Sequence, residues 1–417
     1  MKASKTIRIG LATLSLLTLT ACQGPTPTPA QETPAESQSR SEKRQESSSP
    51  QATDQQTEKT ENRQVEASAA GKNCPDNQAC TSLLFAGDLL VHPLLWAQAQ
   101  KDAQTAGQSG LDFAPLIAEQ KPYTDRADLA VCQMETIVAD PAGPYSGYPN
   151  FNVPPQILTA AAQTGWDVCL TASNHAFDRG TQGLERTYRS IQDSGMGVTG
   201  TNLSAQEASQ PDIFTSANGT RIAIISGTYA LNGQTPDQPW QVDLLEPQTM
   251  IAKAQTARQQ GADLVIANMH AGDEYVHQPN SQQKEVAHAL VDSGAFDLIV
   301  GQHAHVVQPI EKYKDTWIVY GLGNNITELS PVYPANNEGI MVNAVFTQQA
   351  DGQWKVHDLR WVSSKIVDQP DYRYCITSPS RPSSNCIDPA EAAASNARVQ
   401  EIVESLGAAQ EGARQWS

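Results

Sequence analysis

Two histidines separated by one residue follow an apolar stretch late in the chain. The run from Phe296 to Val300 is typical of a buried strand, and Gly301 stands directly before Gln302-His303-Ala304-His305. We expect the glycine to let the backbone turn where the strand ends, so that both imidazoles point to one place. Such a pair is a recurrent way to hold a divalent metal, although two structural histidines explain the pattern equally well.

Four further apolar segments are also followed by carboxylate, amide or imidazole side chains. Asp88 follows the first segment, Glu135 the second, Asn174 and His175 the third, and His270 the fourth. In open α/β sheets the carboxyl ends of the strands share one edge, and ligands bind there. Five successive strand ends that offer such side chains predict a metal site.

The elements that must position these residues alternate between short strands and amphipathic helices. Strands are expected over residues 82–86, 129–134, 166–171, 264–269 and 298–300, and helices over 93–105, 155–164, 181–194, 249–260 and 281–293. Thr181 is the expected N-cap of its helix. Hairpins are expected at 213–226, around Asn218-Gly219, and at 307–320 and 339–362, before a last helix over 388–406. This order predicts an α/β fold: a four-layer αββα sandwich with mixed sheets, or one mixed sheet with helices outside.

Composition limits the class of partner. The 417-residue chain has a formal net charge of −17, which argues against nucleic acid because no basic surplus is present to neutralise phosphates. A small anionic substrate remains compatible with this charge, since a bound metal can be the largest local charge in a site.

Residues 1–22 have the pattern of an export signal. Lys2, Lys5 and Arg8 precede a short apolar stretch that ends in Leu19-Thr20-Ala21-Cys22. These last residues resemble a bacterial lipobox, which implies cleavage before Cys22, lipidation of its thiol and an extracytoplasmic protein anchored to the cell membrane. An ordinary signal peptide with an incidental cysteine is the alternative.

Residues 23–73 are rich in Pro, Gln, Ser and Thr, with no aromatic residue and Val65 as the one branched aliphatic. We predict a disordered tether, because such a segment cannot bury enough apolar area to offset its ordering entropy. Residues 74–370 are the expected folded domain, and residues 371–417 the expected cysteine-containing loop and terminal helix.

Six cysteines remain beside Cys22, and an even number in an exported chain suggests disulfides. Proximity favours pairing Cys74 with Cys80 and Cys375 with Cys386. Cys132 and Cys169 lie in expected strands, so they can bridge only if those strands are neighbours, and two buried free thiols are the alternative.

Several segments together resemble the CapA family of poly-γ-glutamate capsule synthesis proteins, within the calcineurin-like metallophosphoesterase superfamily. The resemblance covers roughly residues 82 to 330. It rests on the segments Phe85-Ala86-Gly87-Asp88, Glu135, Ala172 to Gly180, Met269 to Tyr275, Gly301 to Gln308 and Tyr320 to Asn324. It implies a metallophosphatase-like fold and a role in capsule or exopolymer production, with an anionic exopolymer and the synthesis machinery as partners.

The resemblance also implies a metal-ligand set. Glu135 would bridge two metals; Asn174, His270 and His303 would complete one site, and Asp88 and His305 the other. The chain departs from the superfamily pattern at Leu90, where many members have histidine. Leucine cannot bind a metal, so the second site lacks a ligand unless His92 replaces it, and one or two ions are expected. Mixed nitrogen and oxygen ligands favour Mn, Fe or Zn over Mg.

The resemblance places His175 opposite the substrate, where it would stabilise or protonate the leaving oxygen. Asp178 would orient His175, although a charge at a helix N-terminus accounts for Asp178 equally well. Two functions follow. One is a metal-dependent phosphoesterase-like hydrolase that uses a metal-activated water. The other is a non-hydrolytic polymer-binding, assembly or transport component.

Overall fold

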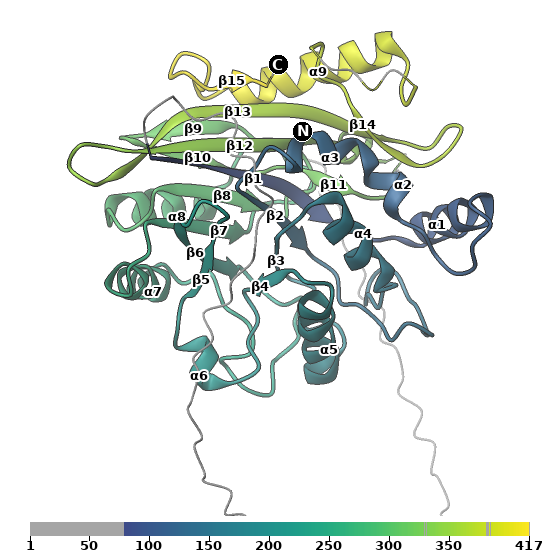
Figure 1. Cartoon of the computed structure of the whole chain (residues 1–417), viewed down its shortest axis with the longest axis horizontal. Helices are drawn as coiled ribbons and strands as arrows, with labels where there is room; N and C mark the ends of the chain where they lie inside the picture. Colours follow the sequence, from purple (N-terminus) through teal and green to yellow (C-terminus); the bar gives the residue numbers. More distant parts are fainter. Residues whose placement is uncertain (1–78, 329, 331, 381–382, 384, 417) are drawn as a thin grey trace, which may run out of the picture. The chain divides into compact units, whose positions relative to one another are not determined.

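The computed structural model describes residues 79–328, 330, 332–380, 383 and 385–416 (Figure 1). The signal peptide, the tether and the Cys74–Cys80 pair involve residues outside these ranges and stay predictions. Within the described part of the chain, no helix combines the length and apolarity that a membrane crossing requires.

Two mixed β-sheets form the centre of the fold. The first contains, in spatial order, β14 (Arg373–Ile376), β13 (Trp354–Val367), β12 (Glu338–Gln348), β1 (Cys80–Leu89), β2 (Leu129–Met134), β3 (Val168–Leu170) and β4 (Gly197–Thr199). To these strands are added β11 (Asn324–Ile326), beside β1, and β15 (Arg414–Gln415), beside β13. The second contains β5 (Asp212–Thr215), β6 (Arg221–Thr228), β7 (Leu264–His270), β8 (Leu298–Gln302), β10 (Thr316–Val319) and β9 (Ile310–Tyr313).

Helices cover the outer faces of both sheets (Figure 1). The first sheet carries α1 (Pro93–Thr105), α2 (Ala114–Ile117), α3 (Lys121–Thr124), α4 (Gln156–Thr164) and α5 (Gly180–Asp193). The second carries α7 (Pro247–Gln259) and α8 (Ser281–Asp292). The short α6 (Ala205–Ala208) precedes β5, and α9 (Pro389–Glu404) packs beside β13.

Side-chain alternation along the strands makes the layers. In β1, Leu84 and Ala86 face the helices, whereas Leu83 and Phe85 enter the apolar cluster between the two sheets. A third cluster lies between the second sheet and its helices. Successive side chains of a strand point to opposite faces, so one apolar strand supplies two cores. The αββα prediction is confirmed, and the alternative of a single mixed sheet is wrong.

An aspartate stands immediately before four of the parallel strands. In each case the carboxylate accepts the backbone N–H at the start of a neighbouring strand. The four N–O pairs are Ser82–Asp128 at 2.8 Å, Ala130–Asp167 at 2.8 Å, Arg221–Asp263 at 2.8 Å and Val265–Asp297 at 2.7 Å. These bonds fix the strand register at the amino ends and leave the opposite edge of the sheets for other side chains.

Two local predictions differ from the structure. Thr181 is not an N-cap: α5 begins at Gly180, and the Thr181 hydroxyl donates to Asp237, 2.5 Å away. The hairpin around Asn218-Gly219 exists, but residues 216–220 lie between its strands, whereas an Asn-Gly pair favours a two-residue connection. Asn218 Oδ1 accepts the Thr220 N–H within the turn, and its Nδ2 donates to the Cys80 carbonyl. Both side chains bond partners that are distant in the sequence.

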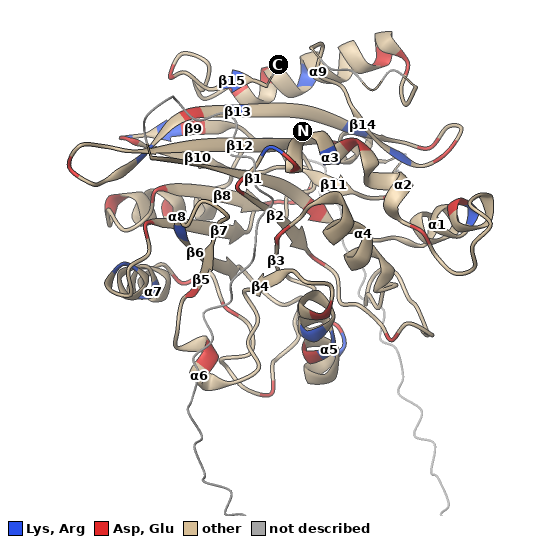
Figure 2. Ribbon diagram, in the orientation of Figure 1, with Lys and Arg blue, Asp and Glu red and all other residues tan. Residues whose placement is uncertain are grey.

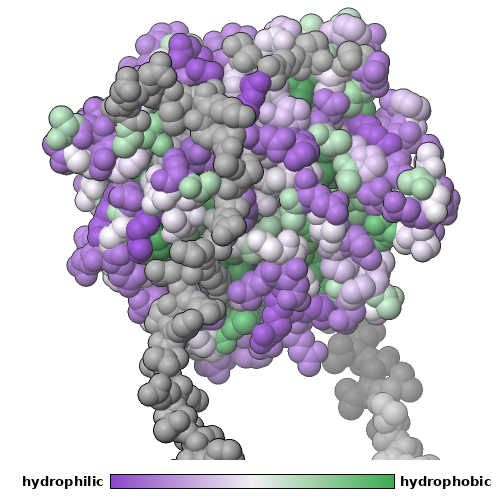
Figure 3. All heavy atoms as spheres, viewed as in Figure 1, coloured by the Kyte–Doolittle hydropathy of each residue, from purple (hydrophilic) through white to green (hydrophobic). Residues whose placement is uncertain are grey.

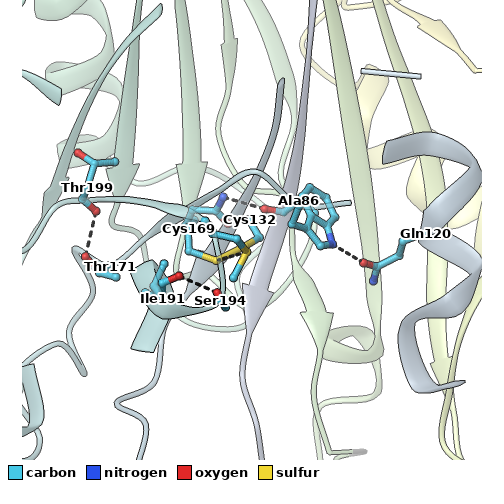
Figure 4. Close-up of a disulfide and its surroundings, with 11 residues drawn as sticks. Ala86, Gln120, Cys132, Cys169, Thr171, Ile191, Ser194 and Thr199 are labelled. Carbon is cyan, nitrogen blue, oxygen red and sulfur yellow. Dashed lines mark hydrogen bonds between the residues drawn. A yellow bond between two sulfur atoms is a disulfide. The ribbon is translucent and has the colours of Figure 1, made fainter. Parts of the chain in front are cut away.

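Cys132 and Cys169 form a disulfide between neighbouring strands (Figure 4). They are direct partners in the parallel ladder of β2 and β3, with their Cα atoms 4.8 Å apart. The condition stated for this pair is therefore met, and the free-thiol alternative is wrong. The Cys375–Cys386 pairing is confirmed as well. Residues 371–417 add β14 and β15 to the first sheet.

Charged residues of both signs are spread over the outer elements. Figure 2 shows Lys and Arg positions on α1, α5 and α9, close to acidic positions on the same helices, whereas α7 carries basic positions alone. On the face shown in Figure 3, hydrophilic residues predominate and hydrophobic ones form small separate groups. The ligand-type carboxylate, amide and imidazole side chains are instead buried, at the edge of the sheets where the parallel strands end.

Candidate metal centre

Six of the ligand-type residues meet where the carboxyl ends of parallel strands from both sheets come together. Asp88 lies in β1, and His270 ends β7. Glu135 and His303 directly follow β2 and β8, whereas Asn174 and His305 lie in the loops just beyond β3 and β8. All are buried, and none is more than 5% exposed. The set is Asp88, Glu135, Asn174, His270, His303 and His305.

The atoms of this cluster converge on Glu135. Its Oε1 lies 3.8 Å from His270 Nε2 and 3.6 Å from His305 Nε2. One ligand atom each of Glu135, His303 and His305 lies within 4.8 Å of the other two. On the other side, Asp88 Oδ1 is 3.9 Å from His270 Nδ1. These separations leave the side chains arranged around one common space.

Several buried atoms of the cluster have no hydrogen-bond partner. Buried polar groups in proteins are nearly always paired, so a group of unpaired acceptors in one place needs an explanation. Carboxylate oxygens and imidazole nitrogens are ligands of divalent transition metals, and a bound cation would satisfy them. The unpaired atoms are Asp88 Oδ1, Glu135 Oε1 and Oε2, His270 Nδ1 and His303 Nδ1. The residues therefore fit a metal.

Burial sets the protonation of the cluster. Burial raises the pKa of Asp88 to about 7, although the backbone hydrogen bond from His303 acts in the opposite direction and lowers it. Burial also raises the pKa of Glu135 well above its usual range. Burial also lowers the pKa of His303 to about 3 and that of His305 to about 4. The imidazoles are thus neutral, which is the form that binds metals, and a cation is the charge that would favour ionised carboxylates.

The His303-Ala304-His305 turn differs from the sequence-based expectation. Gly301 lies inside β8, and a Cβ there would stand 1.9 Å from the Tyr320 carbonyl oxygen, so glycine is needed for close backbone approach. The turn is made by the histidines themselves, with φ of 89° at His303 and 55° at His305. The His303 N–H donates to Asp88 Oδ2 at 3.1 Å, which ties the turn to β1.

His175 and Asp178 form a buried pair beside the cluster. His175 Nδ1 lies 2.8 Å from Asp178 Oδ2, which also accepts the Phe151 N–H at 2.8 Å. The ring of Phe151 contacts His175 edge-on, with centroids 4.8 Å apart. The Asp178 side chain therefore orients the imidazole, and the catalytic role of the pair stays a prediction.

His92 and Leu90 lie at the margin of the site. The structure places His92 outside the ligand group, with Nδ1 3.1 Å from the Leu90 carbonyl oxygen and 3.3 Å from the Glu328 nitrogen. Leu90 packs in the apolar cluster between the first sheet and its helices. At the position where the superfamily resemblance implies a further ligand, this chain thus has a buried hydrophobic side chain.

Three contacts at the site had no clear signal in the sequence. The Tyr229 ring lies 4.6 Å from that of His303. Asn232, in a left-handed conformation, accepts a hydrogen bond from the Asn174 amide at 3.3 Å. Tyr275, also left-handed, donates its N–H to the Ala304 carbonyl at 2.8 Å. Only the Asn232-Gly233 dipeptide, a common turn sequence, could have indicated any of them.

Comparison with known protein families identifies the family of this chain. The family described as "Bacterial capsule synthesis protein PGA_cap" matches residues 82–328, which is more than half of the chain. The chain belongs to this family. The resemblance found in the sequence is thereby confirmed.

Two relatives have names that refer to capsule or PGA biosynthesis. The PGA biosynthesis protein CapA of Bacillus subtilis is 35% identical over 163 residues, which cover 38% of this chain and 41% of the relative. The capsule biosynthesis protein CapA of Bacillus anthracis is 32% identical over 175 residues, 40% of this chain and 42% of the relative. The chain thus spans about two fifths of the length of the curated relatives that it matches.

Solved structures with a similar fold include the calcineurin-like phosphoesterase YfkN of Bacillus subtilis. It has a TM-score of 0.42 and 15% sequence identity, covering 79% of this chain and 99% of that chain. The NAD nucleotidase of Haemophilus influenzae has a TM-score of 0.39 and 14% identity, covering 78% and 63%.

Proposed function

We propose that this protein is a surface-anchored, metal-dependent hydrolase of capsule or exopolymer production, acting on a phosphoester or a related polymer linkage. The observation that supports it most is the group of buried, unpaired carboxylate and imidazole atoms around Glu135. The capsule and PGA biosynthesis names of the relatives support the process. The polymer substrate is proposed to be anionic, as in poly-γ-glutamate.

Asp88, Glu135, Asn174, His270, His303 and His305 would hold the metal. Their mixed nitrogen and oxygen atoms favour Mn, Fe or Zn over Mg. A divalent metal bound there supplies Lewis-acid chemistry for hydrolysis.

The chain itself supplies a proton donor. Asp178 accepts the Nδ1–H of His175, which holds the ring in place and leaves Nε2 for the substrate side. Protonated His175 then donates from Nε2 to the leaving oxygen as the scissile bond breaks. Phe151 restricts the ring from the side, so the donor keeps one orientation.

Leu90 favours a second candidate function. A hydrophobic residue at the position of a further ligand would weaken a second metal, and a weak site suits a polymer-binding, assembly or transport component. Under this alternative the protein binds metal and polymer but does not hydrolyse the chain.

Elemental analysis of the purified full-length chain, with a bis(p-nitrophenyl) phosphate assay, tests the proposal. We expect one to two equivalents of Mn, Fe or Zn, lost in His303→Ala and kept in His357→Ala, whose exposed histidine in β13 is the matched control. Two equivalents would mean that another group replaces the missing ligand. No metal under any loading condition would contradict the hydrolase proposal, and metal without turnover of this or polymeric phosphodiesters would favour the binding role.

Anchoring at the membrane surface is proposed from the lipobox-like residues that end at Cys22. Fractionation of cells that produce Cys22→Ser should move the protein from the membrane to the soluble extracytoplasmic fraction. Unchanged membrane association of the variant would remove the lipid anchor from the proposal.

A further inference from the structure

The segment Tyr320–Asn325, which includes the Tyr320 to Asn324 part of the family resemblance, connects the two sheets at the metal centre. It leaves β10 in the second sheet and enters β11 in the first. On the way Leu322 N–H donates to the Gly301 carbonyl at 3.3 Å, and the Gly323 carbonyl accepts the Asp88 N–H at 3.2 Å. It therefore bonds β1 and β8, two of the strands that carry or precede the clustered ligands.

The Tyr320–Asn325 segment and β1 approach each other closely. A Cβ on Gly87 would stand 1.8 Å from the Gly323 carbonyl oxygen, so β1 and the segment can meet only through glycine. The next residue, Asn324, is 1% exposed and pairs with Asp88 in the parallel register of β1 and β11. Its side chain consequently lies beside the ligands.

The hydrogen bonds of Asn324 fix the orientation of its amide. Its Nδ2 lies 2.9 Å from the Asn336 carbonyl oxygen and 3.4 Å from the His305 carbonyl oxygen. Carbonyl oxygens only accept, so the NH2 group must face them. The Oδ1 atom therefore faces His305 Nδ1, at 3.0 Å.

An amide oxygen cannot donate, so the proton of neutral His305 must be on Nδ1. The Nε2 lone pair is then free, and this atom lies 3.6 Å from Glu135 Oε1. Asp88 Oδ2 is farther from His305 Nδ1, at 3.7 Å, beyond hydrogen-bond distance. Histidine ligands commonly donate their second N–H to such an outer partner, which sets tautomer and ring orientation.

We propose that Asn324 is a positioning residue that selects the Nδ1–H tautomer of His305 and presents Nε2 to the metal. The metal part rests on the proposed function. Among His270, His303 and His305, only His305 has an amide partner at Nδ1, whereas Nδ1 of the other two is unpaired. This assigns a purpose to the Tyr320–Asn325 segment: it joins the sheets and orders one ligand.

The test uses two substitutions and two readouts on the full-length protein. Asn324→Leu removes the acceptor and the donor, whereas Asn324→Asp keeps the acceptor and removes only the donor. Asn343→Leu is the matched control, because Asn343 is a fully buried asparagine of β12 with no hydrogen bond to its amide. The readouts are the His305 tautomer, by long-range ¹H–¹⁵N NMR assigned with His305→Ala, and the Zn²⁺ affinity by calorimetry.

We expect Asn324→Leu to lose the Nδ1–H tautomer and to bind Zn²⁺ about 10- to 100-fold more weakly. Asn324→Asp should keep the tautomer and most of the affinity, although both variants unfold more easily. If Asp and Leu behave alike, or if Asn324→Leu keeps the tautomer and the affinity, the positioning role is wrong. A wild-type protein that shows the Nδ1–H tautomer but binds no Zn²⁺ would contradict the proposed metal function while supporting the tautomer assignment.

Discussion

Left-handed backbone conformations of non-glycine residues gather at the candidate metal centre. Each costs on the order of 1 kcal/mol and persists only where the surroundings hold it. Among the described non-glycine residues with a left-handed conformation, Lys314 lies in the β9–β10 turn, and the others touch the site. Among the residues that the structure describes, the set is Asn232, Tyr275, His303, His305 and Lys314. Strain concentrated in one place supports a functional role for that place.

At the level of single residues, His175 separates metal binding from catalysis. His175→Ala should leave the metal content unchanged, because its ring pairs with Asp178 and Phe151 rather than with the ligands. Hydrolysis of bis(p-nitrophenyl) phosphate should fall by about 10²- to 10⁴-fold, which is the usual contribution of a positioned proton donor. Elemental analysis and initial rates measure the two effects. Turnover equal to that of the wild type would remove His175 from the mechanism.

At the level of strands, the two edges of the sheets have different tasks. Aspartates bind backbone N–H groups at the amino ends, and the ligands lie at the carboxyl ends. Strands fixed in register at one edge can place side chains precisely at the other. The scaffold and the site are therefore built from the same strands but from separate residues.

Asp167 gives this scaffold a pH dependence. Burial raises the pKa of Asp167 to about 7 in the folded state, above its ordinary value of 3.8. A raised pKa means that the folded state binds the proton more tightly, so this stabilisation is complete below about pH 4 and is lost as pH rises through 7. Asp167→Asn can still accept the Ala130 N–H but cannot ionise. The free energy of unfolding of this variant, relative to wild type, should therefore rise by about 2 kcal/mol between pH 5 and pH 8.

Urea unfolding at the two pH values measures this difference. Asp193→Asn, at the exposed end of α5, is the matched control and should show no such gain. An unchanged difference between Asp167→Asn and wild type at pH 5 and pH 8 would mean that Asp167 is ionised throughout this range.

At the level of the whole fold, two disulfides secure different parts of the first sheet. The Cys132–Cys169 bond joins β2 to β3 under α4 and α5 and spans a sequence separation of 37 residues. The Cys375–Cys386 bond spans 11 residues in the segment that also supplies β14. The longer closed loop removes more conformational entropy from the unfolded chain.

Removal of the two bonds should therefore lower the free energy of unfolding by different amounts. We expect a loss of about 4 kcal/mol for Cys132→Ala with Cys169→Ala, and about 3 kcal/mol for Cys375→Ala with Cys386→Ala. Urea unfolding of the two double variants measures both. The reverse order would show that native packing of the late segment, rather than loop closure, decides the contribution.

Local patterns were sufficient for the elements and for the types of ligand. The helix over Pro93–Thr105 and the strand over Leu129–Met134 have the boundaries expected from periodicity, because periodicity reflects which face of a segment is buried. The polar residues that follow each strand could be recognised in the sequence because the same periodicity marks where each apolar segment ends. Their common location follows from the rule that parallel strands end at one edge.

Contacts between distant segments decided the rest. The Cys132–Cys169 bond required β2 and β3 to be adjacent, and Gly301 proved to serve a close approach of Tyr320 instead of a turn. Likewise, Asn324 acquires a role only when β11 lies against β1, next to His305. Periodicity along a chain records burial, but it does not record which segments pair, because pairing depends on the summed packing of the whole core.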